Sequence, residues 1–97
     1  MADFCITQVR YNEAREYIDF VHVREEKAGD NVGAPRTVSR HFIADLIRLG
    51  KASFQTRTEG RNGNWIKGAS VVVYDKKFLT TEGNRTQRDN LGELPEF

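Results

Sequence analysis

The stretch Ser39–Gly50, SRHFIADLIRLG, constrains the fold most, because it is the one segment with a clear helical period. Its apolar residues recur at the spacing of a single helix face, which consists of Phe42, Ile43, Leu46 and Ile47. A helix of about eleven residues is marginal alone in water. We therefore expect the apolar stripe to be buried against strands from the rest of the chain.

Both ends of this predicted helix carry sequence signals. Ser39 is a good N-cap, since its hydroxyl can accept from an unpaired amide of the first turn. Gly50 suits the left-handed position that follows a helix. The side chains of Arg40, Asp45 and Arg48 lie off the apolar stripe, so we expect them to face water.

The other segments rich in β-branched and aromatic residues predict strands. The expected strands are Phe4–Tyr11, Tyr17–Arg24, Ala52–Thr58, Ala69–Tyr74 and Phe78–Thr81. Residues 25–35 are charged and contain two glycines and a proline, which indicates a loop. The predicted order is ββαβββ, an α+β fold with a mainly antiparallel sheet packed on one helix. Neither of the first two strands alternates cleanly, so their register stays open.

Size and composition predict one small domain spanning residues 1–97. The net charge of +1 points to no particular partner. Cys5 is the one cysteine, which excludes an internal disulfide and favours a cytoplasmic setting. No apolar run approaches the roughly 18 residues of a membrane span, so no membrane association is expected.

The C-terminal tail, residues 82–97, has no periodic pattern but carries apolar side chains at intervals of three. These are Leu91, Leu94 and Phe97. Polar tails without such anchors are usually disordered. We expect the three side chains to dock on the body of the domain or on a neighbouring subunit.

The same region carries a family resemblance. The segments KFLTTEGN and DNLGELPEF resemble the ending of the DUF3892 family of small bacterial and phage proteins, in which a Thr-containing strand leads into Asp-Asn-Leu and then Leu-Pro. The matching residues are Leu79, Thr80 or Thr81, Asp89, Asn90, Leu91, Leu94 and Pro95. The resemblance implies a small stand-alone domain with no established activity and no catalytic residue. Many members end in Cys where this chain has Phe97, so no thiol or metal role is implied there.

Charge is unevenly distributed along the chain. Residues 51–88 hold eight basic and three acidic residues, a balance of +5, whereas residues 89–97 hold three acids and no base, a balance of −3. Arginine matches phosphate and aromatic faces stack on bases, so the basic half is a candidate anion-binding surface. Its candidate ligand-binding residues are Arg57, Arg61, Trp65, Lys67, Arg85 and Arg88. The ordinary alternative is that the cations protect strand edges and the aromatics fill the core.

A second candidate anion site lies at the start of the helix. Arg36, Arg40 and His41 lie just before and within its first turn. Free amides and the positive end of the helix dipole attract anions there. These three residues complete the set of candidate ligand-binding residues.

Residues for metal binding and catalysis are scarce. The soft or imidazole ligands are Cys5, His22 and His41, and none has the spacing of a metal motif. A Cys–His nucleophile would need Cys5 and His22 to share one face of the first strand pair. No Walker motif and no nucleophile elbow is present. We therefore expect no metal site, no catalytic residue, no cofactor and no enzymatic activity.

The hypothesis favoured by the sequence is a non-catalytic protein that captures a small anionic ligand, a nucleotide in the first instance. The chain is short, so we expect the site between the subunits of a homo-oligomer. Small phage proteins that sequester defence signals offer an analogy. An alternative is a protein-interaction module or inhibitor that acts through an edge strand or the tail. Nucleic-acid binding is a third possibility.

Overall fold

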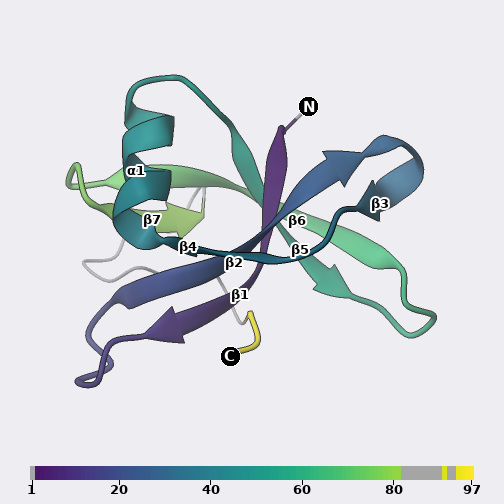
Figure 1. Cartoon of the computed structure of the whole chain (residues 1–97), viewed down its shortest axis with the longest axis horizontal. Coiled ribbons are helices and arrows are strands. Elements are labelled where there is room, and N and C mark those ends of the chain that lie inside the picture. Colours follow the sequence, from purple (N-terminus) through teal and green to yellow (C-terminus); the bar gives the residue numbers. More distant parts are fainter. Residues whose placement is uncertain (1, 82–90, 92–93) are drawn as a thin grey trace.

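The computed structural model describes residues 2–81, 91 and 94–97 of the chain. Their elements are, in order, β1 (Phe4–Tyr11), β2 (Ile18–Lys27), the 3-10 helix η1 (Ala28–Asp30), β3 (Asn31–Val32), β4 (Arg36–Ser39), α1 (Arg40–Arg48), β5 (Phe54–Glu59), β6 (Trp65–Tyr74) and β7 (Phe78–Thr81). Within these residues, seven strands form one sheet around a single α-helix (Figure 1).

The strand order in the sheet is β3-β2-β1-β5-β6-β7, and β4 also pairs with β2. Every pair is antiparallel except β1 with β5, which run parallel. The predicted α+β class with a mainly antiparallel sheet is confirmed. Helix α1 contacts β2 and β4 near one end of this order and β6 and β7 at the other. The sheet is therefore strongly curved, and the helix spans the opening between its two ends (Figure 1).

The pairing of β1 with β2 explains why the sequence of these strands does not alternate cleanly. Ile6 lies opposite Val23 and Val9 lies opposite Val21, with an irregularity of register around Thr7. The two valines of β2 are two residues apart and face the same side, so the bulge brings Ile6 and Val9 to that side as well. All four side chains belong to the hydrophobic core.

The ends of α1 agree with the sequence. The Ser39 hydroxyl accepts a hydrogen bond from the Phe42 amide at 3.3 Å, so Ser39 is the N-cap. Gly50 follows the helix with φ of +69°, the left-handed conformation that glycine adopts at no steric cost. Ile43 is buried in the core, but Phe42 is 55% exposed, so the expectation that the whole stripe is buried was wrong.

Arg40 is the main correction on the helix. It was expected to face water, yet only 3% of it is exposed. Its Nε donates to the carbonyl of Ile18 at 2.7 Å, and a terminal nitrogen donates to the carbonyl of Lys77. The guanidinium also lies over the rings of Tyr17 and Phe78. Arg40 thus joins the first turn of the helix to the start of β2 and to the turn between β6 and β7.

The segment predicted as a loop, residues 25–35, is largely structured. Strand β2 continues to Lys27, and η1 turns the chain back into β3. Gly29 makes this turn with φ of +72°. After β3, the chain continues along the same edge of β2 and forms strand β4. The sequence did not predict this strand. Three of its four residues, RTVS, are polar and two of its side chains are exposed, as expected of an edge strand.

The end of the chain docks on its own domain. Leu91 and Leu94 are buried in the hydrophobic core. The Val9 amide donates to the carbonyl of Pro95 at 2.9 Å, and the Phe97 amide donates to the carbonyl of Val9 at 3.0 Å. This segment therefore occupies the edge of β1 beyond the point where β5 pairs with it.

Arg40→Ala should lower the free energy of unfolding by about 2–4 kcal/mol, because the carbonyls of Ile18 and Lys77 lose the hydrogen bonds from a buried guanidinium. Urea denaturation checks this value. The matched control is Arg48→Ala on the same helix, whose exposed ion pair with Asp45 makes a change of under about 0.5 kcal/mol expected. Equal effects of the two substitutions would contradict the role assigned to Arg40.

Candidate functional site

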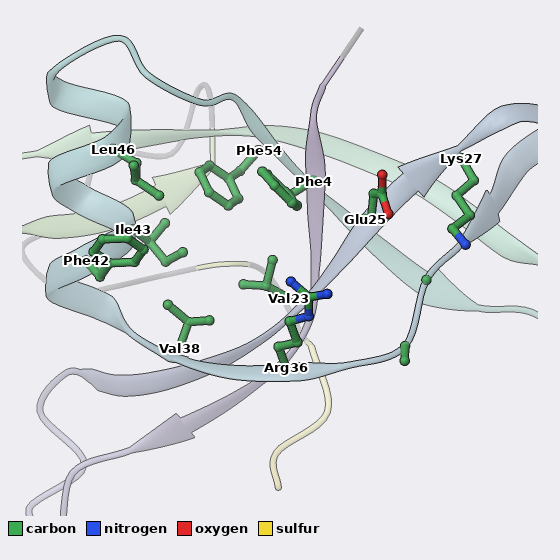
Figure 2. A pocket seen from close by; sticks show the side chains of 12 residues that line it. Phe4, Val23, Glu25, Lys27, Arg36, Val38, Phe42, Ile43, Leu46 and Phe54 are labelled. Carbon is green, nitrogen blue, oxygen red and sulfur yellow. The ribbon is translucent and has the colours of Figure 1, made fainter.

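A pocket of about 490 Å3 opens between α1 and the adjoining face of the sheet (Figure 2). Its walls come from β1, β2, β4, β5, α1 and the link before β4. It is lined by Phe4, Val23, Glu25, Lys27, Gly33, Ala34, Arg36, Val38, Phe42, Ile43, Leu46 and Phe54. The volume lies in the range of pockets for small molecules.

Strand register places these side chains on one face. Phe4 lies opposite both Glu25 of β2 and Phe54 of β5, and Val23 lies opposite Arg36 of β4. Paired residues share a face, and residues two apart along a strand do so as well. The register therefore determines which side chains can reach the pocket.

The part of the pocket nearest the helix is apolar and aromatic. The rings of Phe4 and Phe54 stack with centroids 5.5 Å apart and planes inclined by 24°. Phe42 projects from α1 at the lip of the pocket and is largely exposed. The ring of Phe42 is not part of the hydrophobic core, and its exposed surface can contact a ligand.

Charged side chains occupy the rest of the pocket, with Arg36 near its middle and Glu25 and Lys27 toward the end away from the helix (Figure 2). Lys27 and Glu25 extend from β2, and Arg36 extends from β4 beside Val23 (Figure 2). The Gly33 amide donates to the Glu25 carbonyl at 2.9 Å, which holds the returning chain against β2 at this point. The three charged residues are exposed at the rim, above an apolar floor.

A second pocket, of about 550 Å3, lies near the end of α1 and the start of β5. It is lined by Ala2, Ile47, Ala52, Ser53, Phe54, Gln55, Ser70 and Val71. None of these side chains is charged. The amide of Gln55 already donates to Glu26 at 2.7 Å, and the hydroxyl of Ser53 already donates to Asp3 at 3.1 Å. The described lining of this pocket therefore offers an anion no positively charged side chain.

Of the predicted site residues that the structure describes, only Arg36 lines the first pocket. Arg40 is buried in the contacts described above. His41 is exposed on the first turn of α1, and its Nε2 lies 3.2 Å from a guanidinium nitrogen of Arg40. The predicted anion site at the helix start is therefore reduced to Arg36, because Ser39 caps the helix and Arg40 points into the fold.

Arg57 also serves the fold. Only 3% of it is exposed; its Nε donates to Glu26 at 2.7 Å and a terminal nitrogen donates to the carbonyl of Trp65 at 2.7 Å. Burial alone would raise the pKa of the Glu26 carboxyl, but the hydrogen bonds from Arg57 and Gln55 outweigh it and hold that pKa below its usual range. This buried ion pair lies on the opposite face of the sheet from the pocket, because Glu26 and Glu25 are neighbours on one strand.

The remaining basic residues do not form one surface. Arg61 and Lys67 are exposed around the turn between β5 and β6, where Trp65 is half-buried beneath the guanidinium of Arg24 at 4.7 Å. Lys76 and Lys77 are exposed at the opposite end of β6. Two further predicted site residues, Arg85 and Arg88, lie outside the described residues.

Sequence reasoning missed Glu25, Lys27 and the phenylalanines of the pocket. The available signal was period-two alternation, since Val21, Val23, Glu25 and Lys27 follow one another at intervals of two. The prediction of a loop over residues 25–35 did not take this alternation into account.

Cys5 and His22 do not form a nucleophile. Cys5 is opposite Arg24, and His22 is opposite Gln8, to which it bonds at 2.7 Å. Burial, together with the charge of Glu26, raises the pKa of the Cys5 thiol to about 12, the reverse of what a reactive thiolate requires. Among the described residues, no group of three or more His, Cys, Asp or Glu side chains is placed to hold a metal ion, and no helix is long and apolar enough to cross a membrane.

Glu26→Gln tests the buried pair. At pH 7 we expect a loss of about 3 kcal/mol in unfolding free energy, because the buried Arg57 guanidinium loses the carboxylate charge to which its Nε donates. The folded-state pKa of Glu26 is depressed, so its contribution is complete above the ordinary value of 4.5 and is lost as pH falls through the folded-state pKa. Urea denaturation from pH 7 to about pH 3 should show the wild type and Glu26→Gln converging. A constant difference across this range would contradict the assignment.

Comparison with known families agrees with the resemblance carried by the last part of the sequence. A family model described as "Protein of unknown function (DUF3892)" matches residues 5–95, which include nearly all of β1, every later element and the docked Leu91 and Leu94. No curated protein and no solved structure matches the chain. Since the family model spans most of its length, the chain belongs to the DUF3892 family, whose description assigns no activity.

Proposed function

We propose that this protein binds a small organic anion in the pocket beside α1 and holds it without chemical conversion. The observation that carries the proposal is the arrangement of Lys27 and Arg36 at the rim of an aromatic floor. Apolar pockets with a few convergent polar groups are the usual form of small-molecule sites. The ligand's anionic group would lie near the two cations, and its apolar part would lie against Phe4 and Phe42.

The chemistry of the lining supports binding rather than catalysis. Its described residues include no serine or cysteine, the commonest nucleophiles, and no histidine, the commonest general base near neutral pH. The pocket is formed by residues of one chain, so ligand capture needs no second copy, in contrast to the expected site between subunits. Nucleotides are one class of ligand to test, since aromatic rings stack on bases and Lys and Arg side chains bind phosphate.

The two other hypotheses have less support. Capture of a protein partner through the tail requires a free segment, whereas Leu91 and Leu94 are buried in the core. Nucleic-acid binding is favoured by a continuous basic surface. Among the described residues of the predicted basic surface, Lys67 and Lys76 instead lie exposed toward opposite ends of β6.

Titration calorimetry with a panel of organic anions, nucleotides included, tests the proposal. Arg36→Ala and Lys27→Ala should each weaken binding by about tenfold, the effect of removing one hydrogen bond to a charged group. Lys67→Ala is the matched control, because this exposed lysine lies away from the pocket and should leave the affinity unchanged. An absence of heat with every anion, or an equal effect of all three substitutions, would overturn the proposal.

A further inference from the structure

We infer that the ligand of this pocket is a singly charged anion with an apolar body, of the chemical class of hydrophobic monocarboxylates. This inference rests on the proposed function and narrows it. It depends on three features of the pocket: the charge at its rim, the few hydrogen-bonding groups in its lining, and the separation of its charged and apolar ends.

The charge at the rim matches one negative charge. Lys27 and Arg36 contribute +2 and Glu25 contributes −1, which leaves +1. Within the part of the chain that the structure describes, none of these three side chains is tied up in a hydrogen bond or ion pair with another residue. A monoanion would neutralise the rim, whereas a phosphate dianion would bring its second charge close to the Glu25 carboxylate, where like charges repel.

The described lining offers few hydrogen-bonding side chains to a polar ligand body. Apart from the three charged side chains, every lining residue that the structure describes is glycine, alanine, valine, isoleucine, leucine or phenylalanine. A nucleobase and ribose carry several donors and acceptors, and these would lose water in the pocket without finding partners. An aliphatic or aromatic body has no hydrogen bonds to water to lose. Its binding is favoured by the removal of apolar surface from water.

The layout of the pocket fits a molecule with its charge at one end. Figure 2 shows Lys27 at one extreme and Leu46 with Phe42 at the other, with Arg36 and Val23 between them. A carboxylate beside Lys27 and Arg36 would direct its apolar chain past Phe4 toward the helix. The open lip at Phe42, which is 55% exposed, would be covered by that chain.

Calorimetry with decanoate, decanol and adenosine monophosphate tests the inference on the folded full chain, with decanoate kept below its micelle-forming concentration. Decanoate should bind at least about tenfold more tightly than either other compound, since only decanoate combines one charge with an apolar body. Arg36→Ala should remove most of the advantage of decanoate over decanol, because it should weaken decanoate binding much more than decanol binding.

Glu25→Gln provides the sharper test, because it removes the repelling charge from an exposed position at nearly constant shape. We expect the affinity for the nucleotide dianion to rise about tenfold and the affinity for decanoate to rise by a smaller factor. Circular dichroism of each variant verifies that it is folded.

The outcomes separate this inference from the proposed function. Tighter binding of the nucleotide than of decanoate, or equal gains from Glu25→Gln for both anions, would overturn the inference and leave anion capture intact. Equal affinity for decanoate and decanol would also overturn it, because the charge would then play no part. Failure of every anion to bind would overturn the proposed function itself.

Discussion

The buried guanidinium of Arg40 determines how the helix sits on the sheet. It donates to the carbonyl of Ile18 on one side and to that of Lys77 on the other. These two points belong to β2 and to the turn before β7, which are far apart in the strand order, so a single side chain helps close the curved sheet. The pocket lies beside this closure, between α1 and β4, and its shape depends on where the helix is fixed.

Local signals predicted local structure well. The cap at Ser39, the left-handed Gly50 and the strand Phe78–Thr81 lie where the sequence placed them. Interactions between distant segments could not be predicted in this way. Arg40 looks like a surface residue by its helix position, and Arg57 looks like part of a basic surface. Arg40 is buried where backbone carbonyls of distant residues accept its hydrogen bonds, and Arg57 is buried where the carboxylate of Glu26 does so. The periodicity of the sequence does not indicate such partners from distant segments.

Net charge along the chain did not indicate which cations line a common pocket. The balance of +5 over residues 51–88 suggested one anion-binding surface. In the fold, Arg57 is neutralised by Glu26, and the exposed Lys67 and Lys76 lie toward opposite ends of β6. The pocket takes its cations instead from Lys27 and Arg36, which lie within a nearly neutral part of the sequence. Strand register, rather than composition, decides which charges face a common cavity.

The central claim is that the ligand binds between α1 and the face of β2 and β4. Nuclear magnetic resonance of isotopically labelled protein, titrated with decanoate, tests it most directly. The account predicts that the amide signals of Val23, Gly33, Val38 and Phe42 shift with ligand, while those of Lys67 and Lys76 stay in place. Shifts confined to the turns that flank β6, with the amides around the pocket unchanged, would contradict it.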